Sequence, residues 1–333
     1  MHFNRYTIIF ILLFLLACTG EKGRFDVEPG RLEDEVEIKR YGKALFEIDQ
    51  ENLPAALEEM QPEFRIFLGS PADIANPVNL RRLEAFVSDT LLRAVYEDCL
   101  EQFPDLYGLE KSLNNAFRYY RYYIPENPVP EVYTYVSGFD YEHKVQFYNN
   151  NLLIALDMYL GEDYPRYKQL GLPGYVLENF HKKYIASDCM YAMAGSFVNL
   201  RQTGEDLLDR MILEGKLLWF VRAMIPDIPV ETLYKYNKEQ LAWAQKNEGL
   251  VWAFIIENNL LYNPDPLVRQ KFLAGNPFTS YFGQDSPPRL GAFIGYRMVE
   301  QYMERNRDVT LQELLQTYDA AEVLKGSRYK PEL

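Results

Sequence analysis

Hydrophobic residues recur at helical spacing through most of the chain, as expected for amphipathic helices that bury one face. The clearest stretches predict helices over residues 78–103, 106–124, 205–225, 238–261 and 288–305. Shorter stretches alternate apolar with polar residues or concentrate β-branched and aromatic ones, which predicts strands over residues 36–40, 132–136 and 152–156. From Ser187 onward the chain is therefore expected to be mostly helical.

Residues at the expected helix starts support these boundaries. Thr203 stands three residues before Asp206, and Asn237 stands three residues before Gln240, so each pair predicts a capping box. Pro226 closes the first of these two helices, since proline cannot continue a helix.

The element order predicts the fold class α+β, as a mostly helical single domain with a small sheet over residues 31–333. No internal repeat, low-complexity tract or long Gly/Ser linker divides this region. The pattern leaves one alternative open, a separable helical half over residues 31–124 that contains a helical subregion over residues 78–124.

The first residues have the layout of an export signal. Arg5 precedes an apolar run over residues 8–16, which is about half of the roughly 20 residues that a membrane-spanning helix needs. The sequence L-L-A-C resembles a bacterial lipobox, which implies cleavage before Cys18 and acylation of that cysteine. We therefore expect a lipoprotein signal peptide over residues 1–17 and a lipidated cysteine with its tether over residues 18–30. Ordinary secretory cleavage is the alternative.

Composition and charge narrow the classes of function. The chain has 333 residues, of which 48% are hydrophobic and 25% charged, as in folded globular proteins. A net charge of −13 repels phosphate backbones, so we expect no nucleic-acid partner. Cys99 and Cys189 lie in apolar helical patterns and are expected to be free and buried, with a disulfide as the alternative in an exported protein.

Common catalytic motifs are absent from the mature sequence. It retains only His143 and His181, and it contains no H-E-x-x-H, C-x-x-C, G-x-S-x-G or P-loop sequence. A tyrosine-rich run over residues 118–123 could stack on sugars or a partner, although its helical spacing puts Tyr119, Tyr122 and Tyr123 on one face and favours core packing.

Carboxylates on apolar helix faces are more informative. Glu214, Glu248 and Glu257 each fall on such a face, where an unpaired charge would be costly. Arg297 is a candidate partner, because it lies on a predicted helix whose Gly291 and Gly295 allow close approach of another backbone. We predict a buried ion-pair network of Glu214, Glu248, Glu257 and Arg297; metal ligation or general acid chemistry is the functional alternative.

The C-terminal half resembles the gliding-motility lipoprotein GldB family of the Bacteroidetes cell envelope. The segments that carry the resemblance are LLDRMILEGKLLWF (207–220), LAWAQKNEGLVWAFIIENNLLYN (241–263), NPFTSYF (276–282), SPPRLGAFIGYRMVEQYM (286–303) and the terminal SRYKPEL. The resemblance implies a lipid-anchored envelope protein that supports gliding motility and the associated type IX secretion machinery through envelope protein partners. It also favours the outer over the inner membrane, with the domain in or facing the periplasm or cell surface.

More distantly, the same segments are similar to zinc proteases that carry H-E-x-x-H on one helix and an E-G pair on the next. Asp188 and Ala192 then stand at the two histidine positions, Cys189 at the general base and Glu214 at the third ligand. A catalytic zinc site needs three protein ligands. The similarity therefore implies a zincin-like (gluzincin-like) pseudo-metallopeptidase core over residues 131–333, with no catalytic residue, metal or cofactor.

Other functions remain open. One is an active zinc peptidase with unusual ligands from Asp188, Cys189, His181 and Glu214. Another is an envelope lipoprotein that binds peptidoglycan or another glycan through its tyrosines. The simplest alternative is that residues 187–198 form an ordinary core helix.

Overall fold

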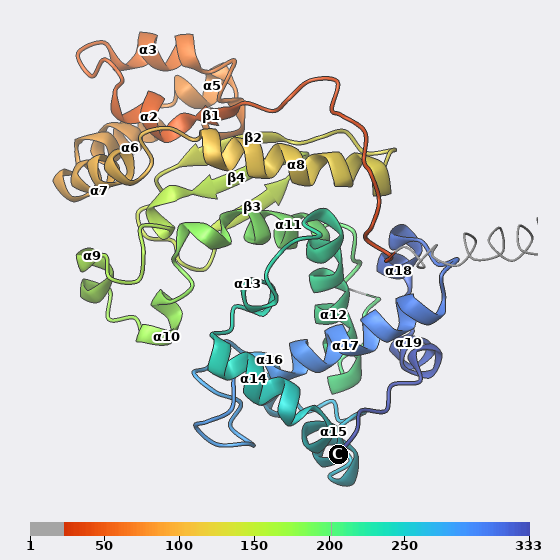
Figure 1. Ribbon diagram of the computed structural model, residues 1–333. Helices are drawn as coiled ribbons and strands as arrows, with labels where there is room; N and C mark the ends of the chain where they lie inside the picture. Colours follow the sequence, from red (N-terminus) through yellow and green to blue (C-terminus); the bar gives the residue numbers. More distant parts are fainter. Residues whose placement is uncertain (1–22, 201) are drawn as a thin grey trace, which may run out of the picture.

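A mixed four-stranded sheet and two long crossing helices carry the fold (Figure 1). The computed structural model describes residues 23–200 and 202–333, so the predicted signal peptide (1–17) and Cys18 lie outside the described residues. Over those described ranges, no helix has the length and apolar character needed to cross a bilayer.

The sheet has the strand order β1-β2-β4-β3. Strands β1, β2 and β4 are parallel, and β3 runs antiparallel to β4. Asn149 and Asn150 join β3 to β4 with φ angles of 47° and 59°, the left-handed conformation that a two-residue hairpin requires. The sequence predicted β1, β2 and β4 but missed β3, whose four residues are too few for a pattern. The strands are β1 (Ile38–Arg40), β2 (Glu131–Tyr135), β3 (Val145–Tyr148) and β4 (Asn151–Ala155).

Side chains alternate between the two faces of the sheet, as the pleat requires. Val132, Leu152 and Ile154 are fully buried in the main core, to which α8 (Tyr107–Tyr123) and α11 (Ile185–Gly195) also contribute. Tyr133 points to the other face and joins a smaller hydrophobic cluster. α11 also packs against the long helix α12, so it is a central core helix.

The smaller cluster is built from short helices between residues 41 and 88, which Figure 1 shows in orange at the end of the molecule away from α17. The predicted helix over residues 78–103 is two helices, because Asp89 ends one and caps the next by accepting a hydrogen bond from the Leu92 amide. The helices between residues 41 and 88 are α2 (Tyr41–Phe46), α3 (Leu53–Met60), α4 (Arg65–Leu68), α5 (Pro71–Ile74) and α6 (Pro77–Ser88). The helix that follows them, α7 (Thr90–Gln102), has its buried residues in the main core.

Helices α12 (Leu207–Met224) and α17 (Leu290–Arg305) cross with their backbones in contact. A Cβ added to Gly295 would overlap the Met211 carbonyl, and one added to Gly215 would overlap the Gly295 carbonyl. Glycine is therefore needed on both helices at the crossing. The remaining elements are η2 (Leu156–Met158), α9 (Pro165–Gln169), α10 (Gly174–Leu177), η3 (Lys182–Tyr184), α13 (Val230–Tyr234), α14 (Lys238–Lys246), α15 (Glu248–Glu257), α16 (Pro266–Leu273), α18 (Leu311–Gln316) and α19 (Ala320–Ser327).

The α+β class, mostly helical with a small sheet, is confirmed, whereas some predicted helix ends are wrong. The capping box of α12 pairs Asp206 with Asp209, since the helix begins later than predicted. The box of Asn237 with Gln240 is present, but Asn247 divides the expected helix into α14 and α15. Both described cysteines are free and buried, so the alternative of a disulfide is wrong.

Candidate functional site

Asp188, one of the predicted vestigial metal-site positions, binds two lysine ammonium groups. Lys144 Nζ lies 3.1 Å from its Oδ2 and Lys235 Nζ lies 2.5 Å from its Oδ1. The Tyr159 hydroxyl donates a hydrogen bond to Oδ2 at 2.8 Å. The carboxylate is only 13% exposed, and burial alone would raise its pKa, but the two lysines outweigh burial and lower the pKa of Asp188 to about 2. Asp188 is therefore ionised and fully paired.

Glu214, the predicted third ligand, is paired in the same way. Arg289 Nη2 lies 2.6 Å from Glu214 Oε2, and the Tyr191 hydroxyl donates to the same oxygen at 2.8 Å. Although burial opposes the shift, Glu214 raises the pKa of Arg289. The crossing of α12 and α17 brings this pair together, because Glu214 precedes Gly215 and Arg289 precedes the first residue of α17.

The two pairs form one cluster with more cations than carboxylates. Burial lowers the pKa of Lys235 to about 8, and Lys144 and Arg289 add repulsion that only partly offsets the attraction of Asp188. Lys235 and Arg289 both adopt the left-handed backbone conformation, with φ angles of 57° and 53°, which costs a non-glycine residue about 1–2 kcal/mol. The fold therefore holds these cations beside the carboxylates despite the free-energy cost of the left-handed backbone and of burying the charges.

The other predicted positions lack the chemistry of a peptidase site. Cys189 is fully buried, and burial together with Asp188 raises the pKa of its thiol, while Ala192 is a half-buried aliphatic residue. His181 is exposed, and its Nδ1 accepts a hydrogen bond from the Lys183 amide. Throughout the described residues, no group of three or more histidine, cysteine, aspartate or glutamate side chains is arranged to hold a metal ion.

The predicted ion-pair network is divided in the structure. Arg297 Nε lies 3.1 Å from Glu248 Oε1, and its guanidinium also pairs with Glu300. The Tyr329 hydroxyl donates to Glu248 at 2.9 Å. Glu214 has its own arginine, as described above. Glu257 is exposed, so its predicted burial is wrong: α15 presents that side chain to solvent.

Sequence reasoning missed the cations that complete the cluster. Arg289 carried a usable signal, because a cation directly before a helix opposes the positive end of the helix dipole and so calls for a local acidic partner. Lys144 and Lys235 carried none, since the residue before β3 and the residue after α13 reach Asp188 on α11 only through long-range contacts.

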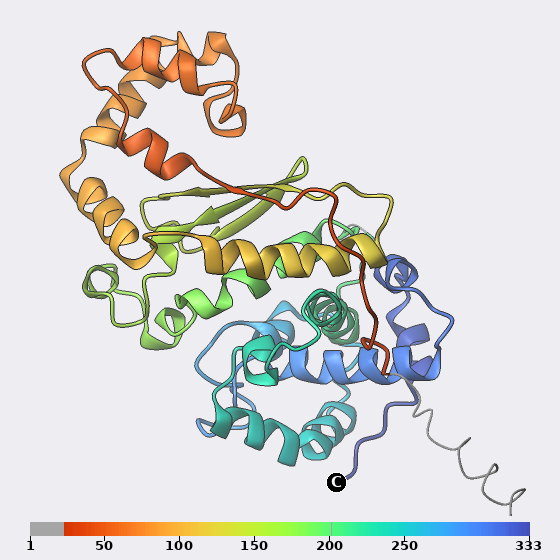
Figure 2. The same cartoon turned by 45° about the horizontal axis from the view of Figure 1, so that its top comes forward.

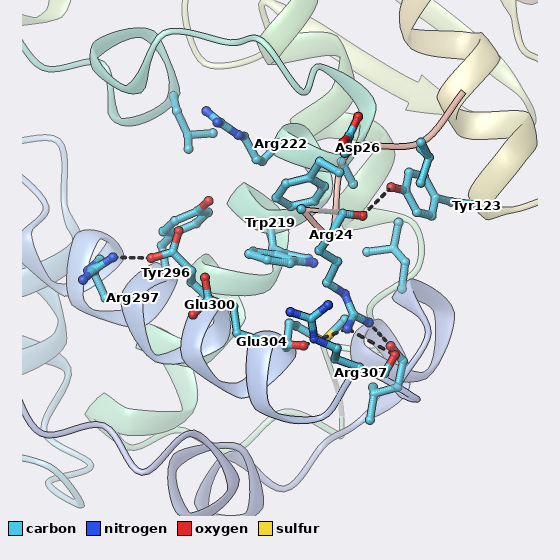
Figure 3. Close-up of a pocket in the computed structure, with 18 of the residues that line it drawn as sticks. Arg24, Asp26, Tyr123, Trp219, Arg222, Tyr296, Arg297, Glu300, Glu304 and Arg307 are labelled. Carbon is cyan, nitrogen blue, oxygen red and sulfur yellow. Dashed lines mark hydrogen bonds and ion pairs between the residues drawn. The ribbon is translucent and has the colours of Figure 1, made fainter. Parts of the chain in front are cut away.

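A groove of about 1170 Å³ lies elsewhere, between α12, α17 and the first described residues (Figure 3). We call residues 23–30 the strap. Figure 3 shows Trp219 at the centre of the groove, with the side chains of Arg24 and Arg307 beside the end of α17. The groove is lined by aromatic residues and by charges of both signs, among them Phe25, Trp219, Tyr234, Phe293, Tyr296, Arg24, Arg222, Arg297, Glu248, Glu300 and Glu304.

Arg24 fixes the strap to the C-terminal end of α17. Its guanidinium donates to the carbonyl oxygens of Met303 at 2.7 Å and Arg307 at 3.3 Å, and also to that of Val309. A helix C-terminus leaves carbonyls unpaired and carries partial negative charge, so a cation is favoured there.

Further contacts hold the rest of the strap. The ring of Phe25 packs on Trp219 with centroids 4.6 Å apart. The Arg118 guanidinium donates to the carbonyl oxygens of Pro29 and Gly30 at 2.9 and 3.0 Å. From Arg24 onward, the segment predicted to be a tether is therefore docked on the domain.

Comparison with protein-family models identifies the family. The sequence model of the lipoprotein family described as "Gliding motility protein GldB" matches residues 22–331. The chain belongs to this family. The match includes the strap, the charge cluster and the groove. No curated protein and no solved structure matches, so the zincin-like core and the zinc-protease similarity stay predictions.

Family membership makes this a gliding-motility-associated lipoprotein in general terms. The family name indicates an envelope protein anchored by lipid, although Cys18 itself lies outside the described residues. In the tyrosine-rich run, the predicted core packing is wrong for Tyr122, which is exposed and lines the groove. Tyr119 and Tyr123 are partly buried against the core, and Tyr120 is fully buried in it.

Proposed function

We propose that this protein is a non-enzymatic, lipid-anchored envelope protein that supports gliding motility and the associated type IX secretion machinery by binding another envelope protein. The observation that carries the proposal is the charge cluster. Lys144 and Lys235 form ion pairs with Asp188, and Arg289 forms one with Glu214. The protein's own side chains therefore neutralise the carboxylates at the positions where the protease similarity places zinc.

Metal binding would have to overcome these ion pairs. A zinc ion at Asp188 and Glu214 would displace three cations whose positions are fixed by the surrounding fold. It would still lack a third ligand nearby among the residues that the structure describes. Cys189 is an unfavourable replacement because its thiol is buried with a raised pKa. The geometry therefore favours a structural role for this cluster.

The groove beside the strap is the best place for a partner. Trp, Tyr and Arg residues carry much of the binding energy at protein interfaces. The exposed Tyr122 and Arg307 and the half-buried Arg222 line the groove. The buried rings of Trp219, Tyr234 and Tyr296 complete its wall. Acidic residues such as Glu300 and Glu304 also line the groove. We propose that the occupant is a polypeptide segment of an envelope protein with apolar side chains and charges of both signs.

The non-enzymatic part is tested by elemental analysis of the full chain purified without added metal, beside Glu214→Ala. We expect no stoichiometric zinc in either protein. Zinc near one per chain that disappears in Glu214→Ala would contradict the proposal and favour a peptidase with atypical ligands.

The partner-binding part is tested by charge reversal at the groove in a gliding strain that lacks its native copy. Glu304→Arg changes an exposed groove residue, and Glu239→Arg on α14 is a matched control outside the groove. We expect loss of gliding with Glu304→Arg at unchanged protein level and melting temperature, and normal gliding with Glu239→Arg.

Photo-crosslinking identifies what lies in the groove. A photoreactive residue at Val230 lines the groove, and one at Leu250 on α15 does not, although both positions are exposed. We expect one envelope protein to be crosslinked from Val230 alone, and Glu304→Arg to abolish that product. A crosslink to glycan instead of protein would favour the peptidoglycan-binding alternative.

A further inference from the structure

A second hollow lies between α17 and α19, on the side of α17 away from the groove. Its volume is about 790 Å³, and Tyr302, Asn306 and Gly326 contribute to its wall. A Cβ on Gly326 would lie 2.6 Å from the Tyr302 ring, so glycine at this position lets α19 pack directly on that ring. The hollow therefore lies at a close contact between α17 and α19.

Basic side chains dominate the edge of this hollow. Arg305, Lys325 and Arg328 line it and are exposed, and Glu322 is the acidic residue among the lining side chains. None of the three basic side chains makes a hydrogen bond or ion pair with any residue in the described ranges. Exposed cations without internal partners attract anions, even on a chain whose net charge is −13.

Acidic residues elsewhere at this end do not line the hollow. Glu304 lines the groove on the other side of α17, and Glu313 accepts hydrogen bonds from Thr310 at the start of α18. Asp308 also lines the groove. The lining of the hollow therefore has three positive charges against one negative charge.

The hollow lies beside the point where the strap meets the domain. The Asn306 side chain lines the hollow, and the Asn306 carbonyl oxygen accepts a hydrogen bond from Arg24 at 3.5 Å. Figures 1 and 2 both show the red start of the described chain at this end, next to the blue helices α17 and α18. Cys18 precedes Arg24 by six residues, which span at most about 20 Å even when fully extended.

We propose that this hollow binds the phosphate headgroup of an anionic phospholipid in the membrane that holds the lipid anchor. The inference rests on the proposed anchoring at Cys18, which keeps the hollow close to the bilayer. A basic patch beside a lipid anchor adds electrostatic attraction to anionic lipids. Each Lys or Arg near an anionic surface strengthens binding by about fivefold. The bound molecule would present its α2–α7 end away from the membrane.

The test uses the full lipidated chain in vesicles of phosphatidylcholine, with or without phosphatidylglycerol. A fluorophore at Lys330→Cys reports on the hollow, and one at Glu58→Cys on α3 is the distant control; Cys99 and Cys189 are buried and do not compete for the label. A lipid with a quencher on its headgroup reports proximity, and flotation of the vesicles reports anchoring.

We expect quenching at Lys330→Cys to increase with phosphatidylglycerol and to fall to the phosphatidylcholine value in the triple variant Arg305→Gln, Lys325→Gln, Arg328→Gln. Glu322→Gln should increase it, and Glu58→Cys should stay unquenched. Equal quenching in both lipids, or no effect of the triple variant, would overturn the proposal.

Two further outcomes are separable. A chain that does not float with either vesicle contradicts the proposed anchoring rather than the headgroup site. Quenching that inorganic phosphate alone prevents, with no preference for phosphatidylglycerol, would identify a free-anion site and overturn the membrane assignment.

Discussion

The charge cluster and the groove are both built on α12 and α17, yet they are opposite kinds of polar region. In the cluster, Asp188 and Glu214 are satisfied by the molecule's own lysines and arginine. In the groove, Trp219 and the charges around it border an open volume of about 1170 Å³. The cluster is closed by internal partners, whereas the groove has room for an external one.

The difference shows that a region can resemble a catalytic site and yet leave no room for a ligand. The positions that resemble catalytic residues lie in the closed region, and no motif marks the open region. A groove of this kind is found only from the structure, because its wall combines the strap with residues from α12 and α17, which are far apart in sequence.

The largest expected effect comes from breaking the crossing on which both regions depend. In Gly295→Val the new side chain would overlap the backbone at Met211 and force α12 and α17 apart. We expect a loss of about 3 kcal/mol or more in the free energy of unfolding, measured by urea denaturation. Gly108→Ala in α8, where an added Cβ meets nothing within 4 Å, is the control and should not destabilise the fold. A small effect at Gly295 would mean that the helices are not in backbone contact.

The charge cluster is broken by Asp188→Ala, which leaves Lys144 and Lys235 without their carboxylate. Removing one partner of a buried pair costs about 3–5 kcal/mol. Here the lysine side chains are 15% and 23% exposed, so we expect about 2–3 kcal/mol in urea denaturation. The triple variant Asp188→Leu, Lys144→Met, Lys235→Met removes all three charges. We expect it to recover most of the stability that Asp188→Ala loses. If Asp188→Ala has no effect, the cluster is not a structural device.

The fold was predictable where local pattern decides it. The helix over residues 106–124 appears as α8 and the one over 288–305 as α17, because both have one long apolar face and clear ends. The edge strand β3 was not predictable, since it depends on pairing with β4 and on the turn at Asn149.

The candidate site was predictable only in part, for a related reason. Helical spacing placed Glu214 and Glu248 on largely buried faces, where both are now seen to be paired. Helical spacing could not show which arginine pairs with Glu214. Arg289 reaches Glu214 because its own backbone is left-handed at the start of α17. The cations that pair with Asp188 stand directly before β3 and directly after α13, and no local pattern marks them.

Acid should weaken the cluster in a defined pH window. The pKa of Asp188 is about 2 in the folded chain against an ordinary 3.8, so its contribution to stability is present above pH 4 and is lost as pH falls through 2. That contribution is about 2 kcal/mol at neutral pH and about half as large at pH 3. We expect the stability difference between the parent chain and Asp188→Asn to shrink accordingly from pH 6 to pH 3. A difference that is constant with pH would contradict the lowered pKa.

The smallest expected effect concerns the strap, whose detachment would open the groove without unfolding the domain. Arg24→Ala removes the hydrogen bonds to the carbonyls at the end of α17 but leaves Phe25 on Trp219. Hydrogen bonds from a charged group are worth about 1.5–3 kcal/mol when fully buried. Because Arg24 is only partly buried, we expect a loss of about 1 kcal/mol in global stability.

Amide exchange should become much faster in residues 24–30 and stay unchanged in α8. Lys39→Met, which removes a surface ion pair with Glu131, controls for loss of a cation and should change neither quantity measurably. If exchange in the strap is already fast in the parent chain, the strap is not a fixed wall, and the groove would be open before any partner arrives.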